Sequence, residues 1–80
     1  MLSEQAIERK KKIEKILDKS KNDFELINQL RTKCERIDFL DKNIILNFEN
    51  EKFEIDKEKA KITKITIFDE KTNNLKEILF

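Results

Sequence analysis

The stretch Lys19-Ser20-Lys21-Asn22-Asp23 decides how the first half of the chain folds, because it separates two segments with apolar residues at helical spacing. If this polar stretch is helical, residues 2–38 form one helix of about 35 residues, roughly 50 Å long, that pairs with a copy of itself. If the stretch is a turn, two helices of about 16 residues fold back as a hairpin. The run of polar, cap-favouring residues favours the break, and Asn22 and Glu25 have the spacing of a capping box.

Each of the two flanking segments carries one apolar stripe. In the first segment the stripe consists of Leu2, Ala6, Ile13, Ile16 and Leu17, and in the second it consists of Leu26, Ile27, Leu30, Cys34 and Ile37. When the sequence is written as heptads, the a and d positions of the first segment continue in the same register through the polar stretch into the second segment. We therefore predict that the helices self-associate through a seam formed by Ile13, Ile16, Ile27, Leu30 and Ile37.

The second half of the chain alternates between apolar and polar residues, which is typical of strands, and the change of period lies near residues 41–43. Two strands are predicted over 44–48 and 53–55. In the turn between them, Asn50 would take the left-handed conformation that a tight turn needs in a chain without glycine.

A third strand is predicted over residues 60–69, but its alternation is broken because Ile62 and Ile65 fall on opposite faces. Such a strand is either buried on both faces or bulged near Thr63 and Lys64. Residues 72–74 supply the next turn. Residues 75–80 fit either a fourth strand or a helical turn.

These patterns predict one small α+β domain spanning residues 1–80. Its helical part, residues 2–40, would be a helical hairpin or a long helix. This part would pack on a three- to four-stranded antiparallel β-meander over residues 43–80. The apolar run Ile78-Leu79-Phe80 is expected to contact the core or a partner subunit.

The composition excludes several chemistries, since the 80 residues include no glycine, no proline and no histidine. Phosphate-binding loops need glycine where the backbone approaches the ligand, and most proton shuttles and nucleophile pairs need histidine. Asp56 and Asp69 border the predicted strands, and we interpret them as part of polar outer faces rather than as a metal site. We expect neither enzymatic activity nor a cofactor.

Cys34 is the single cysteine, so no disulfide can form within the chain. Its place on the apolar stripe predicts a small buried hydrophobic residue. Met1 leads into a largely polar, charged segment where a secretory signal would have a hydrophobic stretch, and no run of about 18 apolar residues is present. The expected location is the cytoplasm, without membrane association.

A lysine-rich helix face is the strongest local charge feature, and it comprises Lys11, Lys12, Lys15 and Lys19. Clustered lysines can contact nucleic-acid phosphates, but they are equally typical of a solvated helix face. A net charge of +1 and the absence of tyrosine and tryptophan favour the solvated face.

The predicted function is that of a small non-enzymatic protein-interaction module, an accessory or regulatory protein of a bacterium or its mobile elements. A domain of this size has a marginal core, so we expect it to act as a homo-oligomer, with a dimer favoured, and to bind a macromolecular protein partner. The alternative is a small nucleic-acid-binding regulator that uses the lysine-rich helix face.

Overall fold

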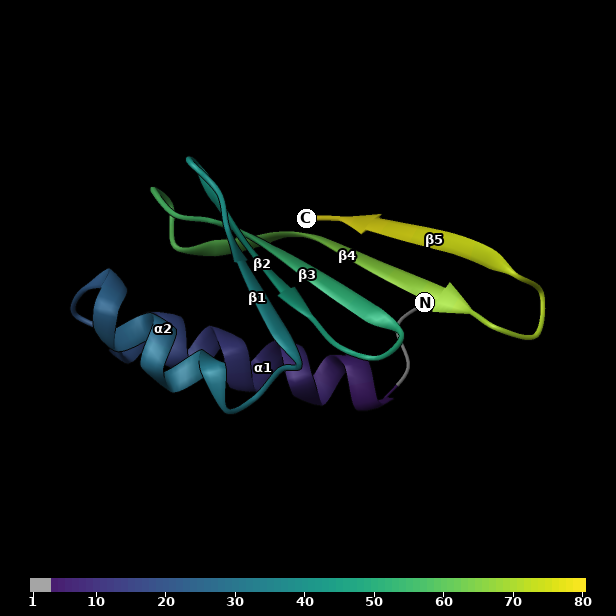
Figure 1. Ribbon diagram of the computed structural model, residues 1–80, viewed down its shortest axis with the longest axis horizontal. Coiled ribbons are helices and arrows are strands. Elements are labelled where there is room, and N and C mark those ends of the chain that lie inside the picture. Colours follow the sequence, from purple (N-terminus) through teal and green to yellow (C-terminus); the bar gives the residue numbers. More distant parts are fainter. Residues whose placement is uncertain (1–3) are drawn as a thin grey trace.

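The protein is an α+β domain in which two helices pack on a five-stranded antiparallel sheet (Figure 1). The computed structural model describes residues 4–80, so the predicted start of the helical part at residue 2 lies outside the described residues. The elements are α1 (Glu4–Lys19), α2 (Asp23–Arg31), β1 (Arg36–Phe39), β2 (Asn43–Asn47), β3 (Glu51–Asp56), β4 (Lys61–Asp69) and β5 (Asn74–Leu79). The strands follow one another in chain order across the sheet. Neither helix is long and apolar enough to cross a membrane within the described part of the chain.

The polar stretch between the helices is a turn, so the hairpin and not the single long helix forms. Ser20 ends α1, since its hydroxyl and its backbone N–H both donate to the carbonyl of Ile16, at 2.7 and 3.0 Å. Asn22 then caps α2, and its side-chain oxygen accepts from the backbone N–H of Glu25 at 2.8 Å. The Asn22 side chain satisfies a backbone N–H that the start of a helix would leave without a partner, and the Ser20 hydroxyl adds a second hydrogen bond at the end of α1.

The predicted helical part is too long, because the chain leaves α2 at Thr32 and residues 36–39 form strand β1. The sheet therefore has five strands rather than three or four. Ile37 pairs with Leu46 of β2, and a tight turn closes with the Leu40 N–H donating to the Asn43 carbonyl at 2.9 Å. Pairing with β2 provides hydrogen-bonding partners for the backbone N–H and C=O groups of this segment, and it places Ile37 against the core. The helical spacing of Ile37 in the sequence could not indicate this strand.

The broken alternation in β4 is resolved by a β-bulge, as one of the two predictions for this strand required. Lys64 pairs with Glu54 and Ile62 pairs with Ile55, which leaves Thr63 as the extra residue. The Thr63 hydroxyl donates to the Glu54 carbonyl at 3.3 Å. The bulge shifts the side-chain alternation by one residue, so Ile62 and Ile65 are both buried on the core face.

The last segment is strand β5, which pairs with β4 in an unbroken register from Asn74 opposite Asp69 to Leu79 opposite Lys64. Both helices lie on one face of the sheet, and the turn between β4 and β5 projects beyond them (Figure 1). The core lies between the helices and the middle of the sheet. It is formed by Ile13, Leu17, Leu26, Leu30, Ile44, Leu46, Phe53, Ile55, Ile62 and Ile65.

The expected left-handed conformation does not occur at Asn50. Among the described residues it occurs at Ala60, with φ 53°, and at Asn73, with φ 56°. Asn73 lies in the predicted turn at residues 72–74, and asparagine tolerates this region well. Ala60 has no such advantage, because its Cβ approaches a carbonyl oxygen in the left-handed region.

Replacing Ala60 with glycine is therefore expected to stabilise the fold by about 1 kcal/mol. The free energy of unfolding from a urea titration measures the effect. The matched variant Asn73→Gly should change stability less, since asparagine already accepts this backbone conformation. An unchanged or lower stability of Ala60→Gly would contradict the expected strain.

Candidate protein-interaction surface

The predicted helical seam is covered by the sheet of the same chain. Ile13 is 2% exposed and Leu30 is fully buried. Ile16 and Ile37 are half-buried against the same core, and Ile27 is half-buried on α2. The seam residues were expected to face a second chain, but the hairpin folds their stripes onto β2, β3 and β4. Ile13 and Leu30 therefore have no surface left for a partner.

The lysine-rich helix face is on the surface, with Lys11, Lys12, Lys15 and Lys19 all exposed on α1. The two basic residues that precede it have structural contacts instead. The Arg9 guanidinium lies 2.7 Å from a Glu51 carboxylate oxygen and 4.2 Å from the centre of the Phe48 ring. The Lys10 ammonium lies 2.9 Å from Glu14 and 5.0 Å from the centre of the Phe80 ring.

The two carboxylates considered for a metal site lie at opposite ends of β4. Asp56 pairs with Lys61 at one end, and Asp69 is the last residue at the other end. Eight residue steps along β4, from Lys61 to Asp69, separate the two positions by about 26 Å. Each carboxylate instead accepts a backbone N–H in its own turn, from Lys59 and from Lys71, both at 3.0 Å. No group of three or more metal-ligating side chains occurs within the described chain.

Cys34 is half-buried between α2 and β1, and its thiol donates to the carbonyl of Leu30 at 3.4 Å. Burial raises the pKa of this thiol, and a hydrogen bond from the backbone of Arg36 opposes the shift. A raised pKa lowers the thiolate fraction at neutral pH, so this cysteine is a weak nucleophile.

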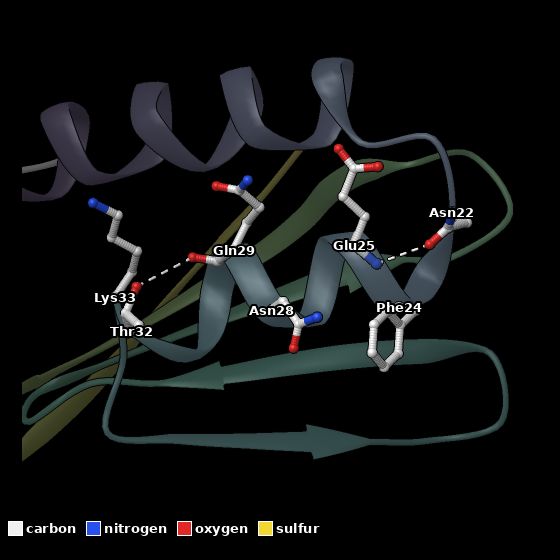
Figure 2. A pocket seen from close by; sticks show the side chains of 7 residues that line it. All are labelled: Asn22, Phe24, Glu25, Asn28, Gln29, Thr32 and Lys33. Carbon is white, nitrogen blue, oxygen red and sulfur yellow. Dashed lines mark hydrogen bonds between the residues drawn. The ribbon is translucent and has the colours of Figure 1, made fainter.

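A shallow recess lies on the outer side of α2, along the helix from its N-cap to its end (Figure 2). Phe24 is 76% exposed, while the rest of the lining is polar. Figure 2 shows Phe24 pointing away from α1, whereas Glu25 and Gln29 point toward it. The recess offers one aromatic ring and no convergent charged groups.

Strand β1 is held to β2 by a polar cluster. The Asn47 side-chain amide donates to an Asp38 carboxylate oxygen at 2.8 Å, and Arg36 lies 3.2 Å from the same oxygen. The hydrogen bond from Asn47, with a smaller contribution from Arg36 and against some desolvation, holds the pKa of Asp38 below its usual range.

This lowered pKa predicts a pH-dependent contribution to stability. Because folding favours the charged carboxylate, the contribution is complete above the pKa of the unfolded chain and is lost as the pH falls below about 4. Thermal unfolding midpoints of the natural chain and of Asp38→Asn, measured from pH 7 to about pH 3, should therefore converge at the acid end. A difference that stays constant over this range would contradict the assignment.

The most exposed apolar strand lies at the other edge of the sheet. We call the outer side of the β4–β5 hairpin, with Phe68, Leu75 and Leu79, the C-terminal edge surface. Leu75 is 69% exposed and Leu79 is 75% exposed. Phe68 is half-buried and pairs directly with Leu75.

The sequence analysis expected residues 78–80 to contact the core or a partner, and two of them, Ile78 and Phe80, lie on the helix side of the sheet, where the Phe80 ring is next to Lys10 of α1. Ile78 is half-buried opposite the fully buried Ile65. Leu75 was missed as a surface residue because its spacing from Ile78 and Leu79 also suited a helical turn. Once β5 is a strand, the alternation Leu75, Glu77, Leu79 indicates a single outward face.

Comparison of the chain with models of protein families, with curated proteins and with solved structures gave no match.

Proposed function

We propose that this chain is a small, non-enzymatic protein-interaction module, a cytoplasmic accessory or regulatory protein that associates with protein chains through its C-terminal edge surface. The observation that carries the proposal is the exposure of Leu75 and Leu79 on an edge strand, while the helices bury their apolar stripes in the core. Edge strands that keep exposed apolar side chains commonly add a strand from another chain.

Site-specific photo-crosslinking in cells that express the chain naturally tests this proposal. A photoreactive phenylalanine analogue at position 79 is expected to give covalent adducts with protein. The same analogue in place of Lys15, on the exposed face of α1, is the matched control and should give few adducts. Equal adducts at both positions, or none at position 79, would overturn the proposal.

A nucleic-acid-binding regulator is the second candidate function, since the four lysines of the lysine-rich helix face are all exposed. Such binding would weaken steeply with salt, because each phosphate contact releases counterions. Fluorescence anisotropy with labelled duplex DNA and RNA, started at about 50 mM salt, tests it. Binding that Lys12→Glu and Lys15→Glu together reduce would support this candidate, and no binding at the lowest salt would remove it.

A further inference from the structure

Strand β5 has backbone hydrogen-bonding groups that face away from the sheet. Phe80 donates its N–H to the Thr63 carbonyl of β4 at 2.9 Å. Every second residue of an antiparallel strand faces the same neighbour, so Lys76 and Ile78 also bond to β4. The backbone N–H and C=O groups of Leu75, Glu77 and Leu79 therefore point outward from the edge.

The same three residues carry their side chains on the face of the sheet opposite the helices. Leu75 and Leu79 are largely exposed there, and the Glu77 carboxylate lies 3.9 Å from the Lys64 ammonium. The strand thus presents a short pattern, leucine, glutamate, leucine, that is symmetric about Glu77.

The two edges of the sheet differ in how open they are. Ile27 and Arg31 of α2 line a recess together with Ile37 and Phe39 of β1, so a helix borders that edge. The helices leave β5 uncovered (Figure 1), and all its residues except Ile78 are exposed. Strand β5 also contains no proline, and its register with β4 has no bulge, although both features commonly block edge pairing.

We propose that the C-terminal edge surface binds a second copy of this chain, with the two β5 strands antiparallel about a twofold axis at Glu77, which joins the two sheets into one. This inference rests on the proposed function and names its partner. Opposed residues in an antiparallel pair have their side chains on the same face of the sheet. A twofold axis between two β5 strands must therefore place one residue directly opposite the same residue of the second copy. With the axis at Glu77, each Leu75 lies opposite Leu79 of the second copy.

The pairing of leucine with leucine, together with the charges, favours this register over its neighbours. An axis at Lys76 would oppose two lysines that have no described carboxylate contact, and an axis at Ile78 would place each Leu79 opposite Glu77 of the second copy, so the leucines would not meet one another. An axis at Glu77 does bring two glutamates together, but the Lys64 ammonium of each copy lies beside its own Glu77. Phe68, which pairs with Leu75, extends the apolar row on each side of the axis.

The chain's charge and size suggest a weak dimer. A net charge of +1 gives little long-range repulsion between copies. The contact of two short strands is smaller than a standard protein interface, so we expect a dissociation constant in the micromolar range or weaker.

Sedimentation equilibrium of the purified chain, from micromolar to millimolar concentration, tests the dimer with a pair of variants at one position. Glu77→Ala removes the opposed charges but keeps the outward N–H, so it should dimerise at least as tightly as the natural chain. Glu77→Pro removes that N–H and leaves the bonds to β4 in place, so its dimer should be weaker by about tenfold or more. Equal dimerisation of the two variants would overturn the strand pairing.

Circular dichroism checks that Glu77→Pro remains folded. If it does not, Leu75→Lys with Leu79→Lys replaces it, because both side chains are exposed in the single chain and the sheet tolerates lysine there. This double variant should sediment as a monomer. A stable dimer of it would equally overturn the proposal.

Disulfide trapping tests the register. In a Cys34→Ser background, Glu77→Cys should form an intermolecular disulfide under mild oxidation, because the two positions face each other across the axis at about 5.5 Å between Cα atoms. The control Leu75→Cys places its two thiols about 13 Å apart along the strands and should cross-link far more slowly. Faster cross-linking of the control would overturn the register.

The outcomes separate this inference from the function on which it rests. A natural chain that stays monomeric at millimolar concentration, yet forms adducts at position 79 in cells, would overturn the second copy as partner and leave the interaction module standing. Absence of adducts at position 79, together with a natural chain that stays monomeric at millimolar concentration, would overturn both.

Discussion

Replacing Leu30 with aspartate is expected to unfold the chain. The Leu30 side chain is fully buried at the centre of the core, between α2 and the sheet. A carboxylate placed there without a partner loses its hydration, which costs several kcal/mol. Small domains have only about 5 to 15 kcal/mol of total stability, at the low end for a chain of this length. Circular dichroism and a thermal melt should show loss of the cooperative transition.

The matched control is Leu79→Asp, which makes the same substitution on the exposed face of β5 and should leave the fold intact. The comparison also separates the two possible roles of the helices. If Leu30 lay in a seam between chains, as its heptad position predicted, Leu30→Asp would yield a folded monomer. A folded monomer would therefore contradict the burial of Leu30 in its own chain.

Replacing Glu51 with lysine is expected to be the next most disruptive change, with a loss of about 2 to 3 kcal/mol. The Glu51 side chain is only 10% exposed, and its partner Arg9 also lies on the Phe48 ring, which in turn makes an edge contact with Phe53 at 5.4 Å between ring centres. A lysine at position 51 would oppose the Arg9 guanidinium in a place that water reaches poorly. The free energy of unfolding in urea measures the loss.

A double variant, Arg9→Glu with Glu51→Lys, restores opposite charges and should recover part of this stability. Recovery is incomplete because glutamate cannot make the cation–π contact with Phe48. The coupling energy of the four chains, natural, two single variants and double variant, isolates the charge interaction. A coupling energy near zero would mean that Arg9 acts through packing alone.

The middle of the strand half, β2 to β4, was largely predictable because its signals are local, whereas residues 75–80 fitted either a strand or a helical turn. Alternation in β2 and β3 indicates which side chains face the core, and the failure of alternation between Ile62 and Ile65 limited β4 to two alternatives, a bulge or burial on both faces, of which the structure has the bulge. The turn between the helices was predictable for the same reason, since Asn22 and Glu25 are three residues apart and meet within one helical turn.

The end of α2 and the existence of β1 were not predictable from local pattern. Leu30, Cys34 and Ile37 have helical spacing, and that spacing is also satisfied when a helix ends and a short strand begins. The choice depends on β2, which supplies hydrogen-bonding partners for residues 36–39 from a distant part of the sequence. A four-residue strand has too few residues to show an alternation of its own.

The candidate surface follows the same division. Leu79 belongs to the apolar run at residues 78–80, which the sequence shows directly. Its exposure, however, depends on how β5 pairs with β4. With β4 and β5 paired, Ile78 faces the core side and Leu79 faces outward. The residues of the predicted helical seam were expected on the surface but are covered, because their stripe faces the sheet of its own chain and not a second helix.

The amino-acid sequence by itself determined that this chain has amphipathic helical segments followed by an antiparallel meander, and it favoured a break between the helical segments and limited β4 to a bulge or burial on both faces. These features arise from periodicity and from side-chain hydrogen bonds to the nearby backbone, which act within a few residues. Only the tertiary structure decided where α2 ends, that β1 exists, and which apolar residues stay on the surface. Those outcomes depend on pairing and burial between distant segments, and every apolar side chain that one segment covers is no longer available to a partner.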